Sequence, residues 1–168
     1  MEINLNNTDT FTMGNPESVL ASSVIYSLTC VPTVLQNPEM EPQYKTAGSA
    51  GADLKVNDSV VLKPHHTLVV PTGVSLAIPE GYVGLVFPRS GLASKGVTLA
   101  NSVGVIDSDY RGEIQVALVN NGYETVRLNR GDRVAQIVFL PVYQFPFTIV
   151  QNLDTTARGN GGFGSTGV

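Results

Sequence analysis

The sequence contains no tryptophan, one cysteine and few charged residues. With Cys30 as its only cysteine, the chain can form no internal disulfide and no zinc site built from several cysteines. We expect Cys30 to be a small buried side chain of a protein in a reducing compartment. Charged residues make up 14% of the chain and the formal net charge is −4, so the basic surplus of a general nucleic-acid-binding protein is absent.

Long apolar runs are also missing from the sequence. No stretch approaches the length of a membrane span, and no basic segment followed by an apolar one opens the chain. We therefore expect a soluble, cytoplasmic protein with no membrane or nucleic-acid partner. With 168 residues, of which 42% are hydrophobic, the chain is long enough to build one domain around a real core.

The chain has a clear apolar pattern with a period of two, which is typical of β-strands. The pattern covers residues 74–78, 83–87, 114–118 and 133–138. Turn residues occur between these segments, at PTG (71–73), IPEGY (78–82), NNGY (120–123) and NRGD (129–132). The Asn121-Gly122 pair predicts a hairpin. We predict an all-β sandwich or barrel, with one short helical turn within residues 89–96.

The last twelve residues, ARGNGGFGSTGV (157–168), are rich in glycine and should be mobile on their own. Three glycines match G-x-G-x-x-G by letters, but no strand precedes them and no helix can follow, which excludes a dinucleotide site. A phosphate-binding loop is excluded because Ser165 stands where lysine is required. The segment is either a frayed terminus or a set of backbone N–H groups that wrap an anion once something holds it.

Two internal segments carry candidate chemistry. PRSGLASKG (88–96) brings Arg89, Ser90 and Lys95 together around two glycines, as an anion site or as a solvated turn. GVIDSDYRGEI (104–114) predicts a hairpin that aims a carboxylate and an aromatic ring at a pocket, although Asp107 and Asp109 also fit ordinary turn acids.

Other polar residues have less specific settings. Asp53 follows a small-residue turn, as structural acids often do, and Gln136 lies in an apolar strand as part of either the core or a site. His65 and His66 are adjacent, so in a strand they would face opposite ways and could not bind one metal ion together. We expect both histidines to lie in an exposed loop.

Five segments in order resemble the motifs of the trimeric dUTPases: SAGADLKV (49–56), PRSGLASKG (88–96), GVIDSDYRGEI (104–114), GDRVAQIVF (131–139) and RGNGGFGSTG (158–167). The resemblance covers roughly residues 25–168. It implies a distorted jelly-roll β-barrel of the β-clip type, assembled as a homotrimer with shared active sites. It also implies Mg²⁺-assisted hydrolysis of dUTP to dUMP and pyrophosphate, which lowers dUTP and supplies dUMP for thymidylate synthesis.

The resemblance also implies a division of the chain. Residues 1–24 are polar, rich in asparagine and aperiodic, so we expect an N-terminal appendage without an assigned role. The resemblance makes residues 25–156 the jelly-roll domain. Residues 157–168 form a glycine-rich arm that closes over the active site of a neighbouring subunit.

By position, the resemblance implies that Asp107 activates the water that attacks the α-phosphorus and that Tyr110 packs under the deoxyribose. Mg²⁺ is held mainly by phosphates and water, with Asp53 supporting it through water. The remaining implied substrate contacts are Asn101, Gly104, Val105 and Ile106 at the uracil, Arg89, Ser90, Gly91 and Gln136 at the α- and β-phosphates, Arg158, Gly164, Ser165 and Thr166 at the γ-phosphate, and Phe163 over the base.

Two other functions fit parts of this pattern. A dCTP deaminase, or a bifunctional relative, would share the jelly roll, but the IDSDYRG segment with Tyr110 and the complete arm favour the dUTPase. Zinc-dependent deaminases are excluded by the cysteine count. A regulatory binding protein that has lost turnover is disfavoured because Asp107 and Arg158 are both present.

Overall fold

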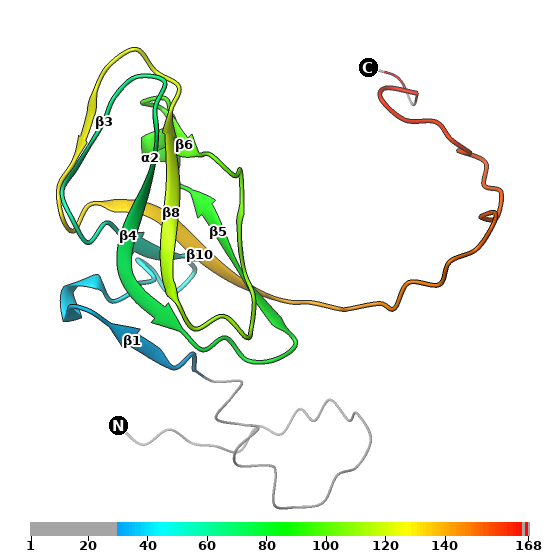
Figure 1. Ribbon diagram of the computed structural model, residues 1–168, viewed down its shortest axis with the longest axis horizontal. Coiled ribbons are helices and arrows are strands. Elements are labelled where there is room, and N and C mark those ends of the chain that lie inside the picture. The colour runs from blue at the N-terminus through cyan, green and yellow to red at the C-terminus, as the bar shows by residue number, and fades with distance from the viewer. Residues whose placement is uncertain (1–29, 166, 168) are drawn as a thin grey trace, which may run out of the picture.

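The computed structural model of the protein describes residues 30–165 and 167. The predicted appendage, residues 1–24, and Thr166 therefore lie outside the described residues. A β body occupies residues 33–141, and the chain then runs away from it as a long extended segment (Figure 1). We call residues 142–165 the arm, which is longer than the predicted glycine-rich arm (157–168) and includes most of it.

Two four-stranded antiparallel sheets form the body. Sheet A has the strand order β1-β4-β8-β6, sheet B has the order β2-β10-β5-β7, and β3 pairs with β9 in a small third sheet. The strands are β1 (Thr33–Leu35), β2 (Ala52–Lys55), β3 (Val60–Leu62), β4 (Thr67–Leu76), β5 (Tyr82–Pro88), β6 (Val97–Leu99), β7 (Gly104–Ile106), β8 (Glu113–Asn120), β9 (Val126–Leu128) and β10 (Arg133–Pro141). The predicted all-β, jelly-roll class is thus confirmed.

The hydrophobic core is built from buried side chains of both four-stranded sheets. In β8 the residues Ile114, Val116 and Leu118 are buried and alternate with more exposed neighbours, as the period of two predicted. Leu54 and Ile137 contribute fully buried side chains from sheet B. Burying one such side chain stabilises the fold by about 1.5–3 kcal/mol, so these strands carry much of the folding free energy.

Two of the predicted turns differ in the structure. PTG (71–73) does not end a strand, because it lies inside β4 at a point where the pairing with β8 shifts register. Asn121-Gly122 makes a turn but no hairpin, because β8 pairs with β4 and β6 whereas β9 pairs with β3. The buried Asn120 explains this path, since its side chain donates to the Leu62 and Glu124 carbonyl groups and directs the chain toward β3.

The helical content of the described chain is small. The predicted helical turn is present as α2 (Ser90–Ala93), and a second, unpredicted 3₁₀ turn, η1, spans Pro38–Met40. Asn37 caps η1 by accepting a hydrogen bond from the Glu39 N–H, a capping pattern that is visible in the sequence. Both helices are far too short to traverse a lipid bilayer.

The arm departs from the body directly after β10. Its first residue, Val142, donates its N–H to the Gly81 carbonyl at 2.8 Å, and the hydrogen bonds recorded farther along the arm join residues of the arm itself. Large apolar side chains of the arm are uncovered in the described structure, with exposed fractions of 79% for Tyr143, 96% for Phe147 and 93% for Ile149.

Candidate active site

A buried carboxylate joins three strands at one end of sheet B. Asp53, only 6% exposed, lies in β2 rather than in the turn that precedes it. Its Oδ1 accepts from the Arg89 Nε at 2.8 Å, and its Oδ2 accepts from the Arg133 Nη1 at 2.9 Å. Because both oxygens have a cationic partner, the buried charge is compensated and both guanidinium groups are fixed in place.

Gln136 of β10 completes this group, which we call the arginine cluster (Asp53, Arg89, Arg133 and Gln136). The Gln136 Nε2 donates to the Pro88 carbonyl at 3.1 Å, immediately before Arg89. Gly51 allows the amide to lie here, because a Cβ at that position would stand 2.7 Å from the Gln136 Oε1. The sequence assigned Gln136 to either the core or a site. In the structure it is half-buried and pairs in register with Asp53.

The predicted phosphate contacts lie next to this cluster. Ser90 and Gly91 begin α2 directly after Arg89, and both are exposed. Ser90 and Gly91 therefore lie directly after Arg89, and Gln136 is hydrogen-bonded to the residue before it, while the contact of these four residues with phosphates stays a prediction. Arg133 was missed, because the strand pairing shifts register between Arg133 and Ala135 and simple alternation does not say which way its side chain points.

Asp107 and Tyr110 lie in a second group, in the loop of residues 107–112. This loop is not the predicted hairpin: β7 pairs with β5 in sheet B, while β8 pairs in sheet A, so the loop crosses between sheets. The Tyr110 hydroxyl donates to the Glu113 carbonyl at 2.9 Å. Asp107 and Tyr110 line a cavity of about 190 Å³ together with Val105 and other neighbours.

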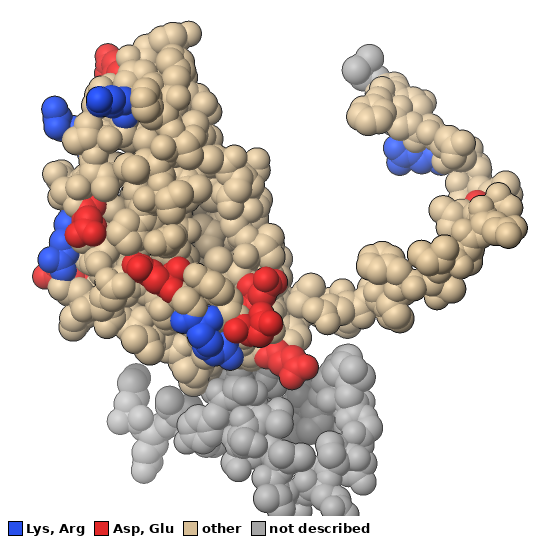
Figure 2. Space-filling view, in the orientation of Figure 1, with Lys and Arg blue, Asp and Glu red and all other residues tan. Residues whose placement is uncertain are grey.

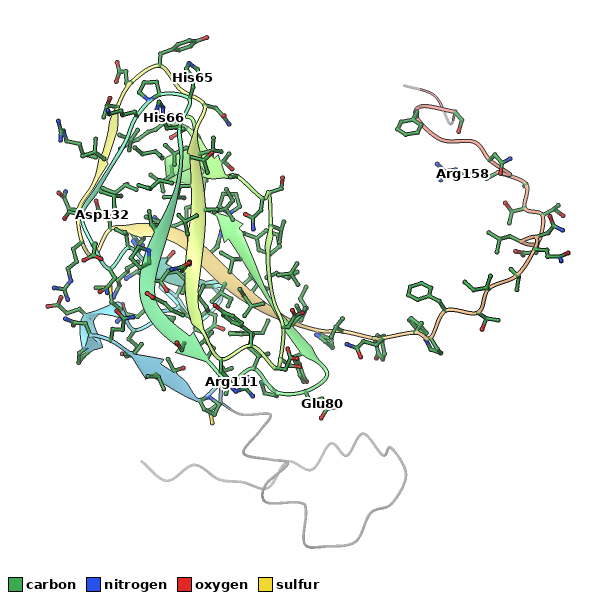
Figure 3. The ribbon with its side chains drawn as sticks, in the orientation of Figure 1. His65, His66, Glu80, Arg111, Asp132 and Arg158 are labelled. Carbon is green, nitrogen blue, oxygen red and sulfur yellow. The ribbon has the colours of Figure 1, made fainter. Side chains whose placement is uncertain are left out.

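Side chains hold the 107–112 loop in shape. The Arg111 Nη1 donates to the Ser108 carbonyl at 2.6 Å and to the Tyr110 carbonyl at 2.9 Å. Figure 3 shows Arg111 at the end of the body near Glu80, and Figure 2 shows acidic and basic atoms side by side at that end. Asp107 and Arg111 also line a wider cavity of about 750 Å³ together with Glu80.

The predicted uracil contacts lead into this loop. Gly104, Val105 and Ile106 form β7, the edge strand of sheet B, and Asn101 lies in the turn before it. The Val105 side chain is 61% exposed, and β7 pairs with β5 on one side only, so its other backbone edge is unpaired by strands. An edge strand presents backbone N–H and C=O groups that a ligand can pair with.

Within one chain, the arginine cluster and Asp107 lie toward opposite ends of β5. Ile106, just before Asp107, pairs with Gly84, whereas Pro88, just before Arg89, pairs with Ala135 of β10. The strand from Gly84 to Pro88 spans about 13 Å at the usual rise per residue. Asp107 and the arginine cluster are therefore separate groups in one chain, about 13 Å apart along β5.

The predicted arm residues approach neither group. The Arg158 Nε donates to the Gly161 carbonyl at 2.8 Å, and Figure 3 shows Arg158 well away from the body. Phe163, Gly164 and Ser165 are exposed, and Phe163 is fully so. Thr166 lies outside the described residues.

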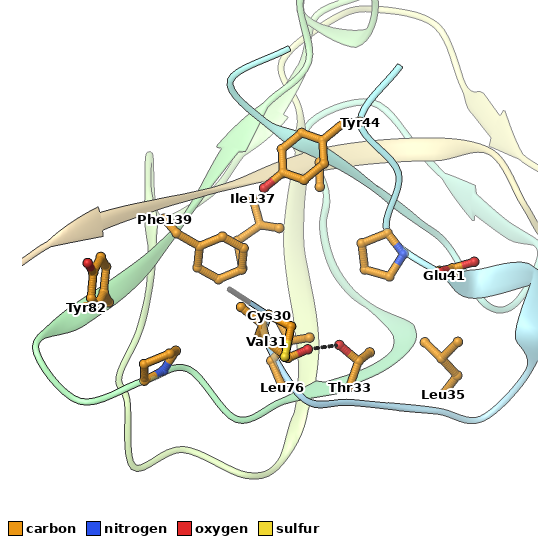
Figure 4. Close-up of a pocket in the computed structure, with 13 residues that line it drawn as sticks. Cys30, Val31, Thr33, Leu35, Glu41, Tyr44, Leu76, Tyr82, Ile137 and Phe139 are labelled. Carbon is orange, nitrogen blue, oxygen red and sulfur yellow. Dashed lines mark hydrogen bonds between the residues drawn. The ribbon is translucent and has the colours of Figure 1, made fainter. Parts of the chain in front are cut away.

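A further cavity of about 520 Å³ is lined by residues of both four-stranded sheets, including Leu76, Tyr82, Ile137 and Phe139 (Figure 4). Cys30 lies at this cavity and is exposed, so the expectation that its side chain is buried was wrong. The residue precedes β1 at the border of the described chain and does not pack in the core.

The histidines and acids of the described residues provide no cluster of metal ligands. His65 and His66 are both exposed, as predicted for a loop. In the part of the chain that the structure describes, no three His, Cys, Asp or Glu side chains are arranged to hold a metal ion.

Comparison with known proteins places the chain in one family. The family model described as dUTPase matches residues 38–167. The deoxyuridine 5'-triphosphate nucleotidohydrolase of Anaeromyxobacter sp. (strain Fw109-5) is 51% identical over 134 residues, covering 79% of this chain and 91% of that protein. The enzyme of the same name from Desulfitobacterium hafniense (strain DSM 10664 / DCB-2) is 53% identical over 131 residues, covering 76% and 87%.

Solved structures agree with this assignment. The dUTPase of Staphylococcus bacteriophage 80alpha with dUpNHpp has a TM-score of 0.77 and 28% identity, covering 83% of this chain and 99% of that one. A mutant dUTPase from phage phi11 of S. aureus, described with a structural Mg(II) ion, has a TM-score of 0.68 and 28% identity, covering 73% and 97%. These matches confirm the resemblance carried by the five sequence segments. The chain belongs to the dUTPase family.

Proposed function

We propose that the protein hydrolyses dUTP to dUMP and pyrophosphate, lowering dUTP and supplying dUMP for thymidylate synthesis. Family membership supports the substrate. The observation that carries the proposal is that Asp107 and Tyr110 line the same small cavity, while a separate arginine cluster offers cationic groups suited to phosphates.

Asp107 is the proposed base. Its carboxylate is exposed at the cavity that it shares with Tyr110, where it can accept a proton from a water molecule aimed at the α-phosphorus. An ordinary aspartate is a weak base, but most of the catalysis in phosphoryl transfer comes from positioning and charge stabilisation. Tyr110 packs under the deoxyribose in this proposal, where a 2′-hydroxyl would collide with its ring.

The arginine cluster is the proposed phosphate support. Arg89 is held by Asp53, and Ser90 and Gly91 follow it at the exposed start of α2, where they can contact the α- and β-phosphates with Gln136. Because both Asp53 oxygens accept from arginines, Asp53 fits contact with Mg²⁺ through water rather than direct ligation. Bound Mg²⁺ would neutralise phosphate charge while being held mainly by phosphate oxygens and water.

The open edge of β7 is the proposed uracil reader. Gly104, Val105 and Ile106 pair with β5 on one side only, so their outer backbone groups can bond to the base, with Asn101 beside them. Cytosine exchanges a donor and an acceptor relative to uracil and would leave groups unpaired. A mismatch of that kind is rejected by about 10⁴ or more.

The complete site is proposed to require a homotrimer. Asp107 and the arginine cluster are separate groups in one chain, and the arm exposes apolar side chains that a neighbouring subunit would cover. In this assembly residues 25–156 form the domain and residues 157–168 close over a neighbour's site. There Arg158, Gly164, Ser165 and Thr166 would bind the γ-phosphate and Phe163 would cover the base. Three chains of 17.8 kDa give a particle of about 53 kDa.

One incubation tests the proposed reaction. The protein is given dUTP or dCTP with Mg²⁺, and pyrophosphate and ammonia are measured. We expect pyrophosphate from dUTP and no ammonia from dCTP. Ammonia release from dCTP would identify a deaminase, and tight dUTP binding without pyrophosphate would identify a binding protein without turnover.

A further inference from the structure

The PTG segment (71–73) forms a bulge in β4. Pro71 pairs with Gln115 of β8 and Ser75 pairs with Glu113, so β4 advances four residues while β8 advances two. Gly73 has a φ of +70°, and a Cβ at that position would stand 3.1 Å from the Asn57 side chain. Both the backbone angle and the close approach therefore favour glycine.

Side chains replace the missing strand pairing at this bulge. The buried Thr72 hydroxyl donates to the Ile114 carbonyl at 2.6 Å. The Gly73 N–H donates to the Glu113 Oε1, also at 2.6 Å. Both acceptors belong to the first two residues of β8, so the bulge holds the start of this strand through two short hydrogen bonds.

Glu113 connects the bulge to the loop that carries Asp107. Its main-chain carbonyl accepts the Tyr110 hydroxyl at 2.9 Å, while its carboxylate accepts from Gly73. Glu113 also lines the 190 Å³ cavity with Asp107 and Tyr110. One residue thus contacts the distal bulge through its side chain and the candidate active-site loop through its backbone.

We propose that Glu113 is a positioning residue, which fixes the Tyr110 ring and the 107–112 loop by anchoring the start of β8 to the Gly73 N–H of the bulge. This inference rests on the proposed dUTP hydrolysis. The required property of Glu113 is an acceptor oxygen at the right distance. Its negative charge is not required, so glutamine should replace it and a shorter or apolar side chain should not.

The expected kinetic effect is a loss of geometric precision. Without the acceptor the Gly73 N–H loses its partner, and the start of β8 can shift together with the carbonyl that holds Tyr110. A displacement of about 1 Å can lower turnover about 10²-fold. Because Tyr110 is proposed to contact the sugar where UTP carries a 2′-hydroxyl, the ratio of kcat/KM for dUTP to that for UTP should fall as well.

The test uses the full-length protein with three substitutions, Glu113→Ala, Glu113→Asp and Glu113→Gln, and Glu124→Ala as an exposed acidic control. We measure kcat and KM for dUTP and UTP well below each variant's Tm. Glu113→Ala and Glu113→Asp should lower kcat/KM for dUTP about tenfold to hundredfold and narrow the dUTP-to-UTP ratio. Glu113→Gln and Glu124→Ala should stay within about twofold of wild type.

Each outcome decides the proposal. A lower Tm with unchanged kinetics in Glu113→Ala would make Glu113 merely structural. An equal loss of kcat/KM in Glu113→Gln would mean that the negative charge is required, which contradicts the proposal. If Glu113→Ala does not fold, the contrast between Glu113→Asp and Glu113→Gln carries the same decision.

A second readout separates this inference from the proposed function. In amide NMR spectra, the resonances of residues 108–112 should shift in Glu113→Asp and stay near their wild-type positions in Glu113→Gln. If wild type hydrolyses no dUTP, the proposed reaction fails while these spectra still test the anchoring. Unshifted resonances in Glu113→Asp would overturn the positioning role.

Discussion

Many apolar side chains are buried in the body, whereas the large apolar side chains of the arm are exposed. In the body, Ile137 and Val116 are buried between sheets, and Asp53 is held by two arginines. In the arm, which runs away from the body (Figure 1), Phe147 and Phe163 are exposed, and the hydrogen bonds beyond Val142 join residues close in sequence. The strands of one chain are thus sufficient to place the body residues, whereas the arm residues have no such support in the described chain.

The largest expected effect is the loss of the body's proposed base. Asp107→Asn should lower dUTP turnover by about 10²–10⁴ while leaving Mg²⁺–dUTP binding nearly intact, because the base acts mainly in the transition state. Binding is measured by calorimetry with a non-hydrolysable analogue. Asp109→Asn, two residues away, is the matched control, and its turnover should stay near wild type. Turnover near wild type in Asp107→Asn would show that Asp107 is not the base.

The next prediction tests whether body and arm act between chains. Asp107→Asn and Arg158→Ala, each inactive alone, are co-expressed in equal amounts so that trimers form at random. If each site takes its acid from one chain and its arm from another, about a quarter of the sites are intact and activity returns to about that fraction of wild type. Activity no higher than that of the separate variants, in trimers shown by mass to be mixed, would mean that acid and arm come from one chain.

A third prediction compares stability in the two regions. Ile137→Ala opens a cavity between the sheets and should lower the free energy of unfolding by about 2–5 kcal/mol. Phe163→Ala removes an exposed side chain and should change it by at most about 0.5 kcal/mol. Urea unfolding of both variants, followed by circular dichroism, gives the two values. A large loss of stability in Phe163→Ala would show that the arm packs in the free protein.

The smallest expected effect is optical. Since the chain has no tryptophan, Phe163→Trp introduces a single indole. Its emission should shift to shorter wavelength when a non-hydrolysable dUTP analogue closes the arm, because the ring leaves water. Phe147→Trp serves as a comparison farther from the proposed lid. A spectrum of Phe163→Trp that stays constant at saturating ligand would mean that position 163 does not cover the base.

Local pattern predicted the strands well and the breaks between them less well. Alternation in 114–118 was sufficient because one face of β8 is buried along its whole length. PTG was assigned to a turn because proline and glycine mark turns and bulges alike, and only the pairing of β4 with β8 distinguishes the two. The Asn121-Gly122 hairpin failed for the same reason, since its flanking strands pair with other partners.

In the candidate site, too, local motifs could be predicted from the sequence, whereas contacts between distant segments could not. The residue types and their order were enough to predict the family, because such motifs are local in the chain. The roles of Asp107, Tyr110, Arg89 and Gln136 follow from the family resemblance and stay predictions. The ion pairs of Asp53 with Arg89 and Arg133 join segments far apart in sequence, and no local pattern specifies them.

Tertiary structure alone placed Asp107 and the arginine cluster toward opposite ends of β5, because that placement depends on the register of β7 and β10 against it. It also showed Glu113 tied to the bulge at Gly73, a contact between residues forty positions apart. Strand content follows from side-chain chemistry at neighbouring positions. Long-range contacts follow from which strands pair and in which register, and that is settled only when the whole core packs.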